Sequence, residues 1–292
     1  RIEILSFGSV NIDNVYCVEY IVKPGETISS KELKLFPGGK GLNQSVALAK
    51  AGVPVYHAGN VGEDGGMLME YCTEYGVDTR LIRKVKTPTG NAMIQVSDTG
   101  ENSIVLFRGA NFENDIEYIK QVLGNFTAGD YLILQNEINC LKEVIDIASE
   151  KEMVIVLNPS PMNQLILDAD LKKVTFFIMN EIEGYQITGR IQPEEILDEM
   201  LRRYPLSKVV LTLGENGAYY EDGKERIFQE IFKVDPVDTT AAGDTFAGYF
   251  IASLVRDIGI KDALMYAAKA SSITVSRMGA AVSIPYQDEV FC

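Results

Sequence analysis

Short runs of apolar residues alternate along most of the chain with stretches whose apolar positions recur at helical spacing. Continuous apolar runs are typical of strands buried on both faces, and amphipathic stretches between them are typical of helices that cover such a sheet. The sequence therefore predicts an α/β fold with a mostly parallel sheet sandwiched by helices. The expected strands cover residues 2–8, 53–58, 131–135, 154–157, 176–179 and 209–213, and the expected helices cover 42–51, 67–75, 141–150, 193–203, 244–255 and 261–277.

Two segments, residues 11–36 and 91–108, interrupt this rhythm with patterns typical of half-exposed strands. In the first, Leu33 and Leu35 alternate with charged residues. In the second, two extended runs flank a turn at residues 98–101, which is a hairpin signal. We therefore expect a small β-sheet that is inserted into the α/β domain as a lid over a site at the strand ends. The α/β domain would comprise residues 1–10, 37–90 and 109–292, and the β lid residues 11–36 and 91–108.

The overall charge of the chain restricts the partners that it can have. Its 292 residues carry a formal net charge of −14, with a sequence pI near 4.6. Such a charge disfavours nucleic acid or an anionic membrane as a partner. An anionic substrate would therefore need a local positive feature, such as a helix N-terminus or a bound cation. No apolar run approaches the ~20 residues that span a bilayer, and the first residues resemble a strand and not a signal peptide.

The few cysteine and histidine residues exclude several kinds of site. Cys17, Cys72, Cys140 and Cys292 are scattered without metal-ligand spacing, which indicates free thiols in a reducing cytoplasm. His57 is the only histidine, and we expect it to be an ordinary strand residue. The sequence therefore argues against a zinc site and against a Ser-His-Asp triad.

The stretch from Asp238 to Asp244, Asp-Thr-Thr-Ala-Ala-Gly-Asp, joins an extended run to an apolar helix-like run. Small residues at Ala241, Ala242 and Gly243 allow a tight turn, and the first N–H groups of a helix are unpaired and attract anions. A carboxylate is useful there if Asp244 takes a proton from a nucleophile while these N–H groups stabilise developing negative charge. This pairing indicates phosphoryl transfer to a hydroxyl group. The alternative is that Asp244 only caps an ordinary helix.

A second glycine-rich stretch, residues 37–43, leads from the inserted sheet into a predicted helix. Gly39 and its glycine neighbours allow the backbone to approach a ligand closely, and Lys40 and Asn43 add donors on the first helical turn. The order of residues is not that of a Walker loop, and no GxGxxG follows a strand. A flexible hinge would explain the glycines but not Lys40 and Asn43.

Polar residues also follow several predicted strands, where ligands bind in open α/β sheets. Asn11 and Asp13 suit the hydroxyl groups of a polyol, although an Asn/Asp turn is the alternative. Asn180 and Glu183 suit a metal-nucleotide, and helix capping is the alternative. The two glycines in residues 212–217 allow close contact with a nucleotide, and a plain hairpin turn is the alternative.

Taken together, these stretches resemble the ribokinase-type carbohydrate kinase family, which includes fructokinases and adenosine kinase. The resemblance covers essentially the whole chain. It rests on GSVNID at 8–13, PGGKGLNQ at 37–44, TGNAMIQVSDTGENSIVLFRGAN at 89–111, NEIE at 180–183, TLGENG at 212–217 and DTTAAGDTFAG at 238–248.

The resemblance implies ATP-dependent phosphorylation of D-ribose at its 5-hydroxyl, giving ribose 5-phosphate and ADP. The same transfer to fructose, 2-keto-3-deoxygluconate or a nucleoside is one alternative, and a non-catalytic sugar-binding protein is another. The presence of Asp244 beside its small-residue turn argues against the second alternative, because binding alone needs no base.

The resemblance also implies roles for individual residues. Asp244 would be the general base, beside the turn at Ala241, with the N–H groups of Ala242 and Gly243 holding the phosphoryl group. The sugar would be held by Asn11, Asp13, Gly39, Lys40, Asn43 and Glu137, and Mg²⁺-ATP by Asn180, Glu183, Thr212, Gly214, Gly217 and Gly243.

A monovalent-cation loop for K⁺ and a homodimer that pairs through the lid are implied by the same resemblance. The residues of the cation loop would be Asp238, Thr240, Thr274, Arg277, Gly279 and Ser283. One departure concerns the last long helix, where related kinases often place Asn or His near adenine. This chain has Ala268 and Lys269 there, so the preference for a purine base is less well defined than phosphate binding.

Overall fold

A ten-stranded sheet forms the centre of the computed structural model, which describes residues 1–291. The strands lie in the order β14-β13-β12-β11-β10-β9-β1-β4-β5, and β6 also pairs with β4. All pairs are parallel except β12–β13 and β13–β14, which confirms the expected α/β class. The strands are β1 (Ile4–Phe7), β4 (Val55–Val61), β5 (Val77–Asp78), β6 (Ile82–Lys84), β9 (Tyr131–Leu134), β10 (Val154–Leu157), β11 (Phe176–Asn180), β12 (Lys208–Thr212), β13 (Ala218–Glu221) and β14 (Arg226–Gln229).

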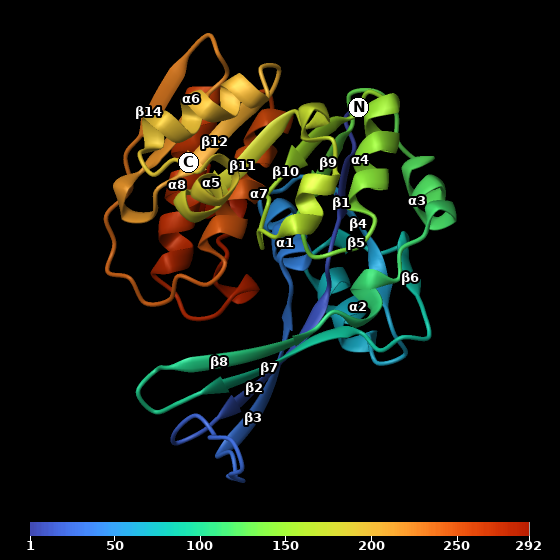
Figure 1. Cartoon of the computed structure of the whole chain (residues 1–292), viewed down its shortest axis with the longest axis vertical. Helices are drawn as coiled ribbons and strands as arrows, with labels where there is room; N and C mark the ends of the chain where they lie inside the picture. The colour runs from blue at the N-terminus through green and yellow to red at the C-terminus, as the bar shows by residue number, and fades with distance from the viewer. Residues whose placement is uncertain (292) are drawn as a thin grey trace.

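Helices cover both faces of this sheet (Figure 1). Successive strand residues point to opposite faces, so Ile4 packs into one apolar cluster and Leu5 into the other. The Ile4 cluster includes α1 (Lys40–Lys50), α2 (Gly66–Glu74), α7 (Ala242–Val255), α8 (Ile260–Val275) and α9 (Gln287–Val290). The Leu5 cluster includes α3 (Ile116–Leu123), α4 (Leu141–Glu150), α5 (Glu181–Thr188) and α6 (Pro193–Arg203).

A four-stranded sheet projects from the body as an arm, at the bottom of Figure 1, and matches the expected lid strands. Its order is β3-β2-β7-β8, with β2 parallel to β7 and the other two pairs antiparallel. Many apolar side chains of the arm are exposed, including Ile104 at 58% and Val105 at 68%. Its strands are β2 (Asn11–Cys17), β3 (Glu32–Gly38), β7 (Gly90–Val96) and β8 (Asn102–Phe107).

Several expectations from the sequence need correction. The alternative of a turn at Asn11 and Asp13 is wrong, because both residues lie within β2 of the arm, inside the segment expected to form the lid. The extended run at residues 232–237 pairs with no strand. The final long helix ends at Val275 and not at 277. Patterning also missed α3, α5, β5, β6, β13 and β14; in α5, Ile182 and Tyr185 are exposed, so that helix has no clear apolar face.

The expectations for His57 and the cysteines agree with the structure. His57 lies in β4, fully buried between the Ser45 hydroxyl and the Gly8 carbonyl, and burial lowers its pKa to about 4. Cys17, Cys72 and Cys140 are free thiols, and Cys292 lies outside the described residues. Among residues 1–291, no helix has the length and hydropathy needed to span a bilayer.

Helices α1 and α7 pack unusually closely. A Cβ atom on Gly248 of α7 would lie 2.4 Å from the Cβ of Ala47 in α1, so only glycine permits this separation. The close packing brings the first turns of the two helices to the same edge of the sheet.

Candidate active site

Asp244 lies in the first turn of α7 and is 6% exposed. The residue before the helix, Ala241, adopts the left-handed conformation with φ of 65°, which is uncommon for a residue that has a side chain. The Asp244 carboxylate accepts hydrogen bonds from two amides of α1, Asn43 Nδ2 at 3.2 Å and Gln44 Nε2 at 3.0 Å. A buried charge is tolerated only when it is hydrogen-bonded, and α1 supplies these bonds.

The tight turn expected before this helix is present. The first N–H groups of an α-helix lack intrahelical acceptors, and Gly243 occupies such a position. The Ala242 N–H already donates to the Thr239 carbonyl at 3.2 Å, so it must leave that acceptor before it can contact a ligand. Gly243 is therefore the better-placed donor of the two.

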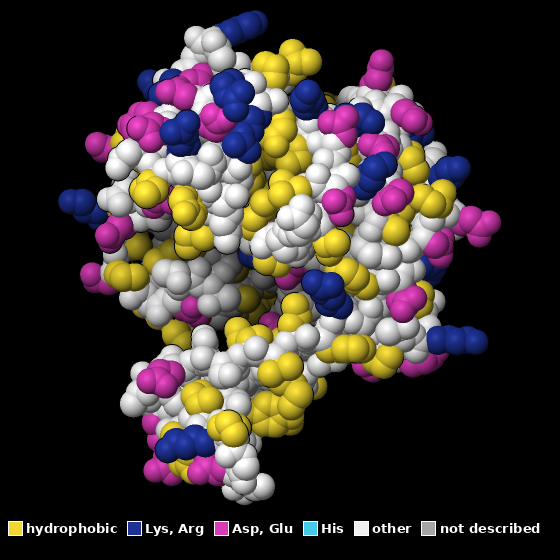
Figure 2. All heavy atoms as spheres, viewed as in Figure 1, with side chains coloured by type: hydrophobic (Ala, Val, Ile, Leu, Met, Phe, Trp, Pro, Cys, Tyr) yellow, Lys and Arg dark blue, Asp and Glu magenta, His cyan; other side chains and the backbone are white. Residues whose placement is uncertain are grey.

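The sugar-site residues expected from the sequence gather where the arm joins the body. Glu137 Oε1 accepts from the Ser9 hydroxyl at 2.7 Å and from the Lys40 N–H at 2.8 Å. The backbone at Gly38 lies so close to Asp13 that a Cβ there would be 2.2 Å from Asp13 Oδ2. Gly39 has a φ of 96°, which favours glycine. Space-filling atoms show a recess between the arm and the body (Figure 2).

Two ionisable groups in this region have shifted pKa values. Burial, together with the charge of Glu137, raises the pKa of Asp13 to about 6. Burial would lower the pKa of Lys40, but the nearby carboxylates of Asp244, Glu137 and Glu183 outweigh it and raise that pKa. Lys40 is therefore a positive charge that nearby acidic groups stabilise.

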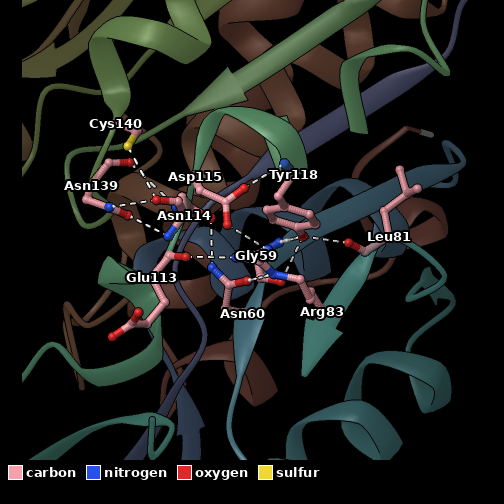
Figure 3. Close-up of polar contacts among 10 residues, drawn as sticks. All are labelled: Gly59, Asn60, Leu81, Arg83, Glu113, Asn114, Asp115, Tyr118, Asn139 and Cys140. Carbon is pink, nitrogen blue, oxygen red and sulfur yellow. Dashed lines mark hydrogen bonds and ion pairs between the residues drawn. The ribbon is translucent and has the colours of Figure 1, made fainter. Parts of the chain in front are cut away.

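A polar cluster fixes the loop that carries Glu137 (Figure 3). Asn114 and Asn139 bond reciprocally, with the Asn114 N–H donating to Asn139 Oδ1 at 2.9 Å and Asn139 Nδ2 donating to the Asn114 carbonyl at 3.0 Å. Asn60 Nδ2 donates to Asn114 Oδ1 at 2.7 Å, and Arg83 Nε donates to Asn60 Oδ1 at 2.9 Å. Sequence reasoning assigned no role to these residues, whose contribution is to hold the loop in place.

The residues expected to bind the nucleotide lie at the carboxyl ends of β11 and β12. Asn180 and Glu183 form a capping box at the start of α5, with bonds of 2.9 and 3.1 Å, so the capping alternative describes their mutual contacts. Thr212 pairs in register with Asn180, and Gly214 and Gly217 have φ values of 58° and 97°. Residues 213–217 also form the turn between β12 and β13. The backbone therefore fits both alternatives for residues 212–217, close contact with a nucleotide and a plain hairpin turn.

The expected cation-loop residues divide into two groups. Asp238 accepts from the N–H groups of Thr240 at 2.9 Å and Gly279 at 3.0 Å. Burial would raise the pKa of Asp238, but these hydrogen bonds outweigh it and lower the pKa. Thr274 lies behind α7, with its hydroxyl 2.9 Å from that of Thr245 and 3.4 Å from the Ser283 carbonyl.

Arg277 points away from the Asp238 carboxylate, because its guanidinium pairs with Glu289 of α9. Lys50, which sequence reasoning missed, instead holds the nearby turn, where Nζ donates to the carbonyls of Ala281 at 2.9 Å and Ile284 at 3.1 Å.

Two further residues at the centre of the site were missed. Gln44 contacts Asp244 directly, and Asn158 Oδ1 lies 3.3 Å from the same Gln44 amide. Asn158 directly follows β10, so its position after a strand was a usable signal. Gln44 could have been suspected only because it follows Asn43 within the glycine-rich stretch.

Comparison with protein families agrees with this geometry. A model described as "pfkB family carbohydrate kinase" matches residues 1–287. The chain belongs to this family. Within the pfkB family, it is similar to a ribokinase from Haemophilus influenzae, with 34% identity over 296 residues that cover 97% of this chain and 95% of that protein.

Solved structures of family members agree as well. The crystal structure of a ribokinase from Thermotoga maritima superposes with a TM-score of 0.89 at 31% identity, covering 100% of this chain and 98% of that one. The structure of Arabidopsis thaliana ribokinase complexed with ribose and ATP gives a TM-score of 0.88 at 29% identity, covering 99% and 97%.

The raised pKa of Asp13 predicts a pH dependence for uptake of the sugar acceptor. If Asp13 binds the sugar as the sequence predicts, its ionised carboxylate would accept hydroxyl protons above a pH of about 6, and below that pH it would be protonated and lose this capacity. We expect kcat/KM for the sugar to fall as the pH drops through about 6, because kcat/KM reports groups of the free enzyme. Asp13→Asn serves as the control, since an amide does not titrate. An identical acid limb in that variant would assign the titration to another group.

Proposed function

We propose that the protein transfers the terminal phosphoryl group of ATP to the 5-hydroxyl of D-ribose, giving ribose 5-phosphate and ADP. The observation that carries this proposal is the buried Asp244 carboxylate, held by two amides at the first turn of α7 and close to the cation Lys40. The ribokinases of similar sequence, and the related structure with ribose and ATP, support ribose as the acceptor.

In the proposed reaction, Asp244 accepts the proton of the 5-hydroxyl as that oxygen attacks the phosphorus of the terminal phosphate. The N–H group of Gly243 stabilises the charge that develops on the transferring group, as does Lys40. The Ala242 N–H joins it after leaving the Thr239 carbonyl. Phosphoryl transfer depends mainly on such positioning and charge stabilisation. Asn11, Asp13, Gly39, Asn43 and Glu137 orient the sugar.

Mg²⁺-ATP is proposed to bind along the ends of β11 and β12, against Asn180, Glu183, Thr212, Gly214 and Gly217. Mg²⁺ keeps several water ligands and is usually held by one or two carboxylates together with substrate phosphates. The donor set here suits that mode, because Glu183 is a carboxylate beside the Asn158 amide, 3.5 Å away. When bound, the ion neutralises the phosphate charge and polarises the terminal group.

The identity of the acceptor is tested by a coupled assay of ADP release across D-ribose, fructose, 2-keto-3-deoxygluconate and nucleosides. Ribose should give the highest kcat/KM. A higher value for another acceptor would retain the transfer chemistry but replace the substrate.

Replacing Asp244 by Asn should leave sugar binding nearly intact and reduce kcat by roughly 10²–10⁴-fold, the usual contribution of a general base. Stopped-time assays with Mg²⁺-ATP and ribose measure the rate, and titration calorimetry with ribose alone measures binding. Near-full kcat in this variant would contradict the assignment of the base.

A monovalent cation, K⁺, is proposed to bind at the loop that leads into α7. The donors fit such an ion, because the Asp238 carboxylate keeps free lone pairs after accepting two N–H groups and lies beside Thr240 and Gly279. Thr274 bonds to the Ser283 carbonyl, and its hydroxyl contacts that of Thr245 in α7. When bound, the ion would supply charge that fixes residues 239–243 and so aims the N–H groups at the phosphoryl group.

Potassium should therefore raise the rate with ribose and Mg²⁺-ATP, and sodium, which is smaller and more strongly hydrated, should substitute poorly. Rates in Tris buffer with KCl, with NaCl and with neither, at matched ionic strength, measure this effect. Asp238→Asn should weaken the response to KCl. Equal rates in all three buffers would remove the cation role and leave the kinase assignment unaffected.

A homodimer that pairs through the arm is supported by its exposed apolar side chains, among them Leu33, Leu35 and Met93. A small isolated sheet with such surfaces is typically covered by a partner. Light scattering should show a dimer at micromolar concentration, and Val105→Glu should shift it toward monomer. A monomeric wild-type protein would contradict this pairing.

The free thiols are consistent with a cytoplasmic location.

A further inference from the structure

Gln44 connects the candidate base to the nucleotide side of the site. It lies in the first half of α1 and is 1% exposed. Its Nε2 donates to Asp244 Oδ1 at 3.0 Å and to Asn158 Oδ1 at 3.3 Å. Its Oε1 accepts from Gln135 Nε2 at 2.7 Å. This one amide therefore bonds to three polar groups from three separate parts of the chain.

The orientation of this amide is imposed by a main-chain carbonyl. Asn158 Nδ2 donates to the Ile178 carbonyl at 2.9 Å, and a carbonyl can only accept. Asn158 must therefore present its oxygen to Gln44, and Gln44 must present its NH₂ group. The same NH₂ group then has a second hydrogen directed at Asp244. A flipped Gln44 amide would place oxygen against oxygen at both contacts.

Asn43 holds the other oxygen of Asp244, but its role differs. Asn43 Oδ1 is a buried atom without a hydrogen-bond partner, and such atoms usually await a ligand or water. Since Asn43 is among the residues proposed to contact the sugar, its contact with Asp244 is available for exchange. The contact from Gln44 to Asp244 is fixed by Asn158 and Gln135, and it does not depend on the sugar.

We propose that Gln44 is a positioning residue for the transfer, which holds Asp244 in the orientation that accepts the proton and ties that orientation to Asn158 and Glu183. This inference rests on the proposed role of Asp244 as the base. Gln44 touches neither substrate, and it acts through Asp244. Loss of Gln44 should therefore affect the chemical step and not the binding of ribose.

The test compares Gln44→Met, which keeps the length of the side chain but has no donor, with wild type. Hydrogen bonds to charged groups typically contribute enough for a change of about tenfold to a hundredfold, so kcat should fall by that factor. The KM for ribose should change by less than about threefold, because uniform binding is retained.

Ser45→Ala is the matched control within the same helix. Ser45 is fully buried and its hydroxyl contacts His57, not Asp244. Ser45→Ala should lower thermal stability without lowering kcat. If Gln44→Met does not fold, Gln44→Glu provides the same readouts in an almost identical volume, and kcat should fall further because a second carboxylate then faces Asp244.

Two outcomes separate this inference from the proposed function. If Asp244→Asn retains turnover, the assignment of the base fails, and the role of Gln44 fails with it. If Asp244→Asn is inactive but Gln44→Met has the kcat of wild type, the base stands and the positioning role of Gln44 is overturned.

Discussion

A buried carboxylate can persist only where the fold supplies donors for it, and the site is organised around this requirement. Asp244 obtains its donors from Asn43 and Gln44, two successive residues of α1. That helix can reach α7 only because Gly248 has no side chain to hold Ala47 away. The distance between the two helices is therefore set by packing, and the chemistry available to Asp244 follows from that distance.

The same helix pair also carries the positive groups of an acidic protein's proposed phosphate site. The chain as a whole is strongly acidic, and an anionic nucleotide would be repelled by its average field. Lys40 and the unpaired N–H groups at the start of α7 are the positive features beside Asp244. The carboxylates that surround Lys40 raise its pKa, so acidic residues keep it charged. A phosphate would be attracted by these local features, against the charge of the chain as a whole.

Much of this arrangement could be predicted from the sequence, because the signals are local. The turn at Ala241, the glycines before Lys40 and the alternation in the arm each depend on a few neighbouring residues. The role of Gln44 could not be predicted in this way, because its contact with Asp244 spans 200 positions. Arg83 and Asn114 were missed for the same reason, since their partners are also distant in the sequence.

The route by which the chain enters the arm has a mechanical consequence. Asn11 pairs in register with Gly38 and Gly90 at the root of the arm, and Asn111 of the body donates to the Asn11 carboxamide at 2.7 Å. Asp13 stands two residues further out on the same strand, whereas Asp244 belongs to the body. A rotation of the arm about its root would thus alter the distance from Asp13 to Asp244. An acceptor held by Asp13 would move with the arm, so a rotation of the arm would also change the distance between the acceptor's hydroxyl and Asp244.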